Sequence, residues 1–220
     1  MEQMQFTAIV LMTLLTLKLL LLPNKVAVNR VMNKSRWLIT VGIILIDVQF
    51  VLQYAIGLRA IGTTPAVMLN LVLFMPAAWL LSLAILYLQQ RGWVSKKQLA
   101  AGPAAWIAGM ACIAIAAAID GQPLLSDTPE LRYAEVAASI GYSVMQCYYT
   151  GQHVFNLYRM HKALQNYYDN DISNILHSMQ WSVAILMVMG IITPLLIFGS
   201  GLWLAAYAIF FFGGIFFFVS

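Results

Sequence analysis

The sequence predicts an all-α, polytopic membrane protein built as a bundle of seven transmembrane helices. The first observation is composition: 62% of the residues are hydrophobic and 9% are charged, whereas soluble domains carry about 25% charged residues. The second is that seven apolar stretches fill the 220 residues, each close to the roughly 20 residues that cross a hydrocarbon core. The third is that no connection between these stretches is long enough to form another domain.

The spans are predicted to be helices because runs such as the last one are apolar on every side. Strands of a membrane barrel alternate apolar and polar residues, and the run from Leu202 to Val219 does not. The first span is expected to be retained rather than cleaved as a signal peptide, because Glu2 stands where a basic segment belongs and Lys18 interrupts the apolar run. The single domain 1–220 is expected to contain helices at about 5–22, 37–57, 65–89, 101–119, 133–158, 180–198 and 202–219.

The distribution of charge predicts the orientation of the bundle. Lysine and arginine concentrate in loops that face the cytoplasm, and here they gather after the first, third and fifth spans. The opposite loops hold Arg59 and Arg132, together with Asp120, Asp127 and Glu130. We therefore expect the N-terminus outside and the C-terminus in the cytoplasm, in a bacterial inner membrane. The basic residues of the cytoplasmic loops are Lys25, Arg30, Lys34, Arg36, Arg91, Lys96, Lys97, Arg159 and Lys162.

The second span carries a carboxylate, Asp47, at its centre. An ionisable residue at that depth costs about 2.5–3.5 kcal/mol on insertion scales, and such residues mark functional sites. At about 1.5 Å per residue, Asp47 lies level with the middle of the fifth span. We therefore predict a hydrogen bond from Asp47 to Tyr142, Gln146 or Tyr149.

The fifth span is the most polar of the seven. Its polar side chains recur at three- and four-residue steps, which places them on one helical face. Because lipid would leave these groups unpaired, the face is expected to turn into the bundle. The face consists of Glu135, Ser139, Tyr142, Gln146, Tyr149 and His153.

Two interpretations of the polar residues remain open. They are either hydrogen bonds that join helices or an outward-facing small-molecule pocket between the second, third and fifth spans. The candidate ligand-binding residues of such a pocket are Asp47, Asn70, Tyr142, Gln146 and Tyr149.

Small residues and prolines predict how other spans pack. A stripe of small side chains on the fourth span favours the close approach of a neighbouring helix; it consists of Ala105, Gly109, Cys112 and Ala116. Pro76 and Pro194 are predicted to kink the third and sixth spans. These kinks serve either as hinges or to shape a cavity.

No residue pattern indicates catalysis, a cofactor or a metal. The last span has no lysine for a retinal Schiff base, and no histidine pair has the H-E-x-x-H spacing of intramembrane metalloproteases. Ser139 and His153 would lie about 21 Å apart along one helix, far beyond hydrogen-bond reach. We therefore expect a protein that is not an enzyme and binds no cofactor or metal.

A structured cytoplasmic elbow is predicted between the fifth and sixth spans. The fifth helix is expected to continue beyond Arg159, and Asp171 supplies turn and capping chemistry. An amphipathic turn then leads to Trp181. With His153, these residues are the candidates for coupling a tilt of the fifth helix to the cytoplasm; an interfacial anchor is the alternative.

The elbow also carries a recognisable pattern, made of Arg159, Ala163, Leu164, Asn166, Tyr167, Tyr168, Asp171, Leu176 and Trp181. This pattern resembles the linker between the fifth and sixth helices in multi-helix membrane regions of Bacteroidetes signalling proteins. There the membrane region precedes an AraC-type helix-turn-helix regulator or a sensor histidine kinase. The resemblance implies that the chain is a seven-span input region cut before such an output domain. It further implies self-association through that domain, and contact with DNA only through it.

The expected function is a membrane-embedded sensor whose partners are the lipid bilayer and an unidentified small ligand. On this hypothesis Asp47→Ala uncouples the stimulus from the output. The alternative is a transporter for a small polar solute, with Asp47 as the proton-coupling carboxylate. A sensor predicts binding without flux and a transporter predicts flux, whereas a purely structural subunit predicts neither.

Overall fold

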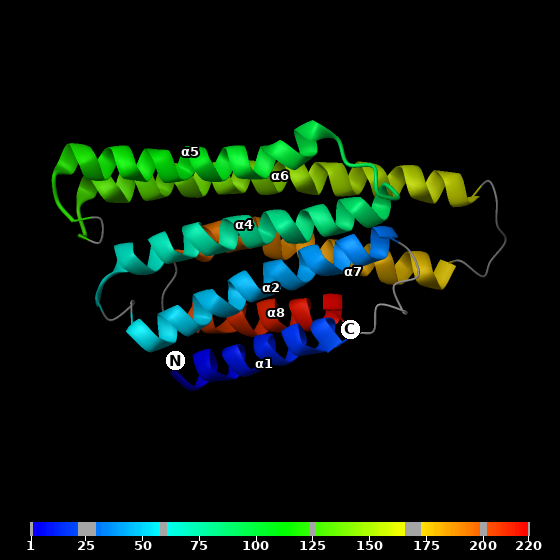
Figure 1. Ribbon diagram of the computed structural model, residues 1–220, viewed down its shortest axis with the longest axis horizontal. Coiled ribbons are helices and arrows are strands. Elements are labelled where there is room, and N and C mark those ends of the chain that lie inside the picture. Colours follow the sequence, from blue (N-terminus) through cyan, green and yellow to red (C-terminus); the bar gives the residue numbers. More distant parts are fainter. Residues whose placement is uncertain are drawn as a thin grey trace.

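The computed structural model describes residues 2–21, 30–57, 61–123, 126–165, 173–198 and 202–219, and within these ranges the chain is all-helical. Figure 1 shows the helices as a bundle in which neighbours run side by side. Their bounds are α1 Glu2–Leu21, α2 Arg30–Ile56, α4 Thr63–Gln89, α5 Lys96–Asp120, α6 Pro129–Gln165, α7 Ser173–Leu196 and α8 Leu202–Val219.

These helices correspond one to one with the predicted spans, and several have longer ends. α8 has the predicted bounds, whereas α2 begins at Arg30 instead of near residue 37 and α6 covers Pro129–Gln165. Three helices of the described chain, α2, α4 and α5, are long and apolar enough to cross a membrane. Shorter apolar stretches lie at Phe6–Leu21 and Val183–Pro194.

Capping chemistry fixes the ends of α5 and α6. The Ser95 hydroxyl accepts from the Gln98 backbone N–H at 3.2 Å, and the Gln98 side chain accepts from the Ser95 N–H at 2.9 Å. α5 ends at Gly121, whose φ of 66° suits glycine. Pro129 opens α6, where its missing N–H costs nothing, and the preceding Thr128 hydroxyl accepts a backbone N–H of the first turn.

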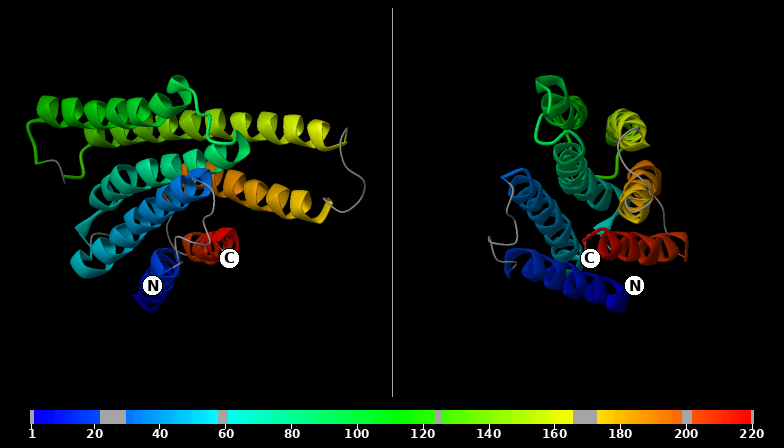
Figure 2. Two further views of the ribbon diagram at one scale, coloured as in Figure 1. Left: turned by 45° about the vertical axis from the view of Figure 1, so that its right-hand side comes forward. Right: turned by 90° about the vertical axis from the view of Figure 1, so that its right-hand side faces the viewer.

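Six of the described helices form a closed ring. In order around it, α1 packs on α2, α2 on α4, α4 on α6, α6 on α7, α7 on α8, and α8 returns to α1. The right-hand view of Figure 2 looks along this ring, with α5 outside it against α4 and α6. The ring therefore has an interior to which α1, α2, α4, α6, α7 and α8 contribute side chains.

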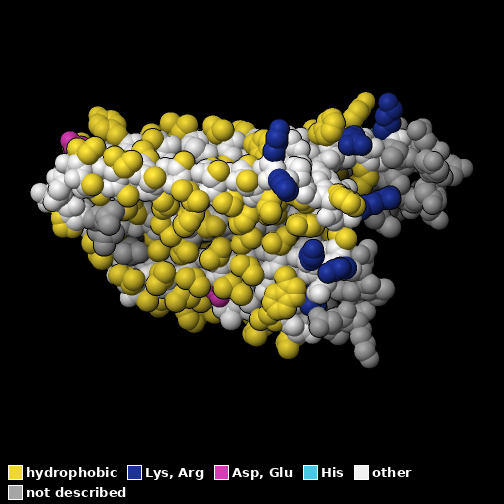
Figure 3. All heavy atoms as spheres, turned by 45° about the horizontal axis from the view of Figure 1, so that its top comes forward, with side chains coloured by type: hydrophobic (Ala, Val, Ile, Leu, Met, Phe, Trp, Pro, Cys, Tyr) yellow, Lys and Arg dark blue, Asp and Glu magenta, His cyan; other side chains and the backbone are white. Residues whose placement is uncertain are grey.

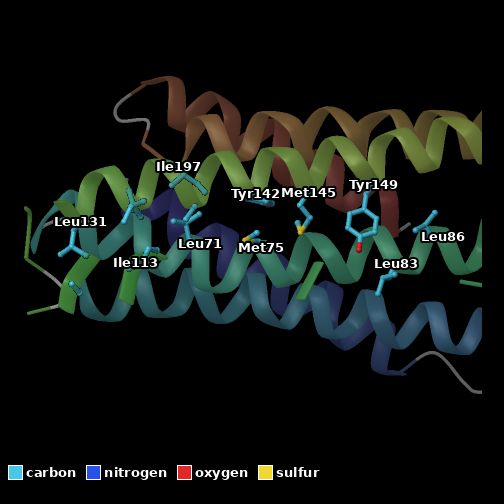
Figure 4. Packing of buried hydrophobic residues seen from close by; sticks show 14 residues of the cluster. Leu71, Met75, Leu83, Leu86, Ile113, Leu131, Tyr142, Met145, Tyr149 and Ile197 are labelled. Carbon is cyan, nitrogen blue, oxygen red and sulfur yellow. The ribbon is translucent and has the colours of Figure 1, made fainter. Parts of the chain in front are cut away.

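Two apolar cores hold the bundle together. The first lies where α4, α5 and α6 meet, and Figure 4 shows its members, among them Leu71, Met75, Ile113 and Met145. The second lies inside the ring and draws residues from α1, α2, α4, α7 and α8. Aromatic rings cross this interior; the Phe50 and Phe212 centroids are 5.2 Å apart.

Most of the described Lys and Arg side chains lie toward one end of the bundle. Figure 3 shows Lys and Arg side chains at the end where α2 and α5 begin and α4 and α6 end. We call this the basic end. α6 extends beyond its neighbours there (Figure 1). At about 1.5 Å per residue, its 37 residues are roughly 55 Å long, well over a hydrocarbon core of about 30 Å. The prediction that this helix continues past Arg159 is therefore confirmed.

The two prolines have different surroundings. Pro76 of α4 lacks the N–H that would bond the Val72 carbonyl, and the Trp106 indole of α5 donates to that carbonyl at 3.2 Å. Pro194 of α7 likewise leaves the Gly190 carbonyl without its helical donor. The first site is held by a neighbouring helix, and the second lies at a cavity described below.

The predicted stripe of small residues is confirmed in part. A Cβ atom added at Gly109 would lie 3.3 Å from the Ala138 Cβ of α6, so the two helices approach closely there. Ala105 and Ala116 pack against the first core. Cys112, in contrast, is exposed on the outside of α5.

Candidate ligand cavity

The polar face of α6 is turned into the bundle, as its periodicity predicts. Every member is at most 5% exposed, although the face lies on a helix that also carries strongly exposed apolar residues such as Val144. The buried members are Glu135, Ser139, Tyr142, Gln146, Tyr149 and His153. The face divides into two sides, one packed against α5 and the other against α4 and α7, with α8 across a cavity.

Tyr149 occupies the α5 side and is fully hydrogen-bonded. Its hydroxyl donates to the Gln98 carbonyl at 2.6 Å and accepts from the Gly102 N–H at 3.1 Å. In a regular helix the Gly102 N–H would bond the Gln98 carbonyl four residues earlier. The Tyr149 hydroxyl inserts between these two groups and bonds both. Tyr149 therefore joins two helices and leaves no hydrogen-bonding capacity of that kind for a ligand.

Asn70 belongs to a second closed cluster, between α2 and α4. Its Oδ1 accepts from Gln49 Nε2 at 2.7 Å and from Gln53 Nε2 at 3.0 Å. All three side chains are buried. The cluster fixes the contact between α2 and α4, and it does not include the predicted partners on α6.

The predicted hydrogen bond from Asp47 to α6 is wrong. Asp47 Oδ2 accepts from the Thr13 hydroxyl of α1 at 3.1 Å. The reason is rotational: Ile46 points into the ring, and the next residue along α2 therefore faces the seam with α1. Residue spacing specifies depth along a helix, but depth does not specify which neighbour a side chain meets.

The ring interior contains a cavity of about 50 Å³. It is bounded by α2, α4, α6, α7 and α8, and none of its described lining residues is Asp, Glu, Lys or Arg. Its polar lining consists of Ser82, Tyr142, Gln146, Thr150, His153 and Thr193. Of the five predicted ligand-binding residues, Tyr142 and Gln146 line this cavity; Asp47, Asn70 and Tyr149 lie elsewhere.

Two buried nitrogens of the cavity lining have no hydrogen-bond partner within the described residues. They are Nε2 of Gln146 and Nε2 of His153, on side chains that are 4% and 3% exposed. A buried donor or acceptor left unpaired costs about 1–3 kcal/mol. Both residues line the cavity, so a molecule inside it could supply the missing partners.

The other nitrogen of His153 shows which role the unpaired one has. His153 Nδ1 lies 3.1 Å from Gln89 Oε1 of α4. Because an amide oxygen only accepts, Nδ1 carries the hydrogen. The Gln89 amide nitrogen meanwhile donates to the His153 carbonyl at 3.5 Å. In the neutral ring Nε2 is then an acceptor, whereas the Gln146 amide nitrogen is a donor.

α7 and α8 form the opposite wall and are joined to each other by polar contacts. The hydroxyls of Thr193 and Tyr207 are in contact, and Tyr207 also donates to the Met189 carbonyl at 3.0 Å. A Cβ atom added at Gly190 would lie 2.8 Å from Gln146 Oε1, so α7 comes close to the Gln146 side chain at this position. The freed Gly190 carbonyl lies on the same wall.

Sequence reasoning missed the contribution of α7 and α8. Thr193 and Gly190 are single small residues in an apolar helix, and no periodic pattern distinguishes them. The available signal was Pro194, since a proline in a span frees the carbonyl four residues earlier.

The candidate coupling residues lie on and after α6. His153 lines the cavity, and exposed Arg159 stacks over the Phe155 ring at 5.8 Å from its centroid. Trp181 of α7 is 55% exposed. Asp171 lies outside the described residues.

Comparison with protein-family models, curated proteins and solved structures gives no match. The function is therefore argued from the cavity and the helices around it.

Proposed function

We propose that the chain is a membrane-embedded sensor module that binds a small molecule in the central cavity. In this proposal all seven helices cross a bacterial inner membrane, with the basic end in the cytoplasm. A cytoplasmic output domain, DNA-binding or histidine kinase, receives the signal. The observation that carries the proposal is the cavity with an unpaired donor and an unpaired acceptor on one wall.

The size of the cavity supports a link between occupancy and movement. About 50 Å³ has room for a few water molecules only. Because helix bundles are packed to near-crystalline density, a molecule larger than this space must displace a wall if it is to lie wholly inside the ring. A ligand that binds the displaced arrangement better shifts the equilibrium towards it.

The α7–α8 hairpin is the wall we propose to move. The opposite wall is braced: Tyr149 joins α6 to α5, and Gln89 joins α4 to α6. The described polar contacts of α7 and α8 join these two helices to each other, which favours a shift of the hairpin as one unit. α8 ends at the basic end, where α6 projects, and both could transmit the shift.

The transporter alternative receives no support from the cavity. Asp47, its proposed proton-coupling carboxylate, faces Thr13 of α1 and is not among the lining residues. A flux assay in proteoliposomes still separates the two functions, since a sensor binds without transport.

A cavity-filling substitution tests the sensor mechanism. Ala78→Leu adds three carbon atoms to the α4 wall and should mimic occupancy. Spin labels on the exposed positions Val144 of α6 and Ile209 of α8 report the separation of the two walls. We expect the distance to lengthen by about 1–2 Å, the usual size of helix shifts in switching proteins.

The matched control is Ala104→Leu, the same change on the exposed outside of α5. It should leave the distance unchanged. If Ala78→Leu inserts normally and also leaves the distance unchanged, filling the cavity does not move the hairpin and the proposed mechanism fails. The native thiols Cys112 and Cys147 are exposed and would be replaced by serine in every variant.

A further inference from the structure

The lining of the cavity restricts the charge of whatever it holds. The lining contains ten apolar side chains, among them Phe74, Leu81, Met189 and Phe211, and no described Asp, Glu, Lys or Arg. A buried ion without a counter-charge is strongly disfavoured. The occupant is therefore uncharged.

The two unpaired nitrogens restrict its hydrogen-bonding groups. Among the described residues the Gln146 amide nitrogen has no acceptor that meets hydrogen-bond geometry, and His153 Nε2, with Nδ1 held by Gln89, has no donor. The two residues are seven positions apart on α6, which is about 10 Å along the helix. Between them on α6 the hydroxyl residue Thr150 also lines the cavity, as does Ser82 of α4; the other α4 lining residues, among them Ala77, Ala78 and Leu81, are apolar.

We propose that the ligand is an uncharged, unbranched molecule with an apolar middle. One end accepts a hydrogen bond from Gln146, and a hydroxyl or N–H at the other end donates to His153 Nε2. This inference rests on the proposed sensor function and names the chemical class that its site takes.

A series of α,ω-alkanediols with four to eight carbons is a direct probe of this class. The protein is placed in lipid nanodiscs, and its thermal midpoint is followed by tryptophan fluorescence, because a ligand of the folded state raises that midpoint with concentration. We expect a length optimum within the series. Amino alcohols and hydroxy acids of the same length, which are charged at neutral pH, should bind at least tenfold more weakly.

Variants separate binding in the cavity from partition into lipid. Gln146→Leu and His153→Phe should each weaken diol binding about tenfold, the value of one hydrogen bond, and Ala78→Leu should abolish it. Gln89→Leu is the control for His153→Phe, because it loses the same α4–α6 contact and keeps the imidazole. Should His153→Phe fail to fold, Gln146→Leu alone decides.

Three results overturn the assignment. They are equal binding of the charged analogues, an equal response in all variants, and no response to any diol. If Ala78→Leu nevertheless moves α8, the ligand class is wrong and the sensor mechanism stands. If Ala78→Leu moves nothing, the sensor mechanism fails whatever the diols do.

Discussion

The two sides of the polar face of α6 use the same kinds of residue in opposite ways. On the α5 side the Tyr149 hydroxyl both donates and accepts. On the α7 side, one turn away in either direction, Gln146 and His153 are as deeply buried, yet each keeps one nitrogen without a partner among the described residues. Burial of polar groups thus does not distinguish a structural contact from a site; what marks the site is an unpaired atom on a side chain that also lines the cavity.

The largest expected effect comes from Gly102→Ala on the closed side. The new Cβ would lie 2.1 Å from Trp79 Cδ1 of α4, at the residue whose backbone N–H donates to the Tyr149 hydroxyl. Relieving that overlap requires the indole or the backbone to move, so we expect the free energy of unfolding to fall by about 1–3 kcal/mol. Unfolding in mixed micelles, followed by circular dichroism, measures it.

Gly141→Ala is the matched control on α6, where nothing lies within 4 Å of the new Cβ. There the helix should gain about 0.5–1 kcal/mol. Equal effects of the two substitutions would show that α5 does not approach Trp79 of α4 as closely as described.

Tyr149→Phe should have the next largest effect. It removes the hydroxyl that joins the Gln98 carbonyl to the Gly102 N–H, and a typical net loss is about 1 kcal/mol. The same micelle titration measures it. Tyr148→Phe, at the more exposed neighbouring tyrosine, should change the free energy of unfolding by less than about 0.5 kcal/mol. An equal loss in both variants would show that the Tyr149 hydroxyl makes no special contribution to stability.

Gln146→Leu should act in the opposite direction on the open side. It removes an amide nitrogen that is buried without a partner among the described residues, so the unliganded protein should gain up to about 1 kcal/mol of stability. If Gln146→Leu instead lowers the free energy of unfolding as much as Tyr149→Phe does, the Gln146 amide already has a hydrogen-bond partner. It would then not be free to donate to a ligand.

Asp47→Asn should have the smallest effect. The substituted amide side chain keeps an oxygen that can accept from Thr13, so the α1–α2 seam should survive with a change below about 0.5 kcal/mol. Binding in the cavity should be unaffected, in contrast to the uncoupling expected from sequence. Diol binding by the Asp47→Asn variant, measured beside the native chain, checks this. Weaker binding by the variant would show that Asp47 contributes to the ligand site after all.

Much of the fold could be predicted because apolar length and helical periodicity are local properties. The seven helices and the burial of Tyr142, Gln146 and His153 on one face follow from apolar length and residue spacing alone. The partners of Asp47 and Asn70 do not, because they depend on how each helix is rotated about its axis and on which helices become neighbours. The ring order that places α7 and α8 opposite α6 likewise arises from packing between distant parts of the chain.

The central claim is that the open side of α6 admits a small molecule and the closed side does not. Thr150→Cys places a thiol on the cavity wall, and Ala138→Cys places one against α5 near Gly109. With Cys112 and Cys147 replaced by serine, both variants in membranes are treated with methyl methanethiosulfonate, a small uncharged reagent, and modification is followed by mass spectrometry. We predict that position 150 reacts, that adding Ala78→Leu slows it at least tenfold, and that position 138 stays unmodified. An unreactive position 150, or equal reaction at both positions, would contradict the account.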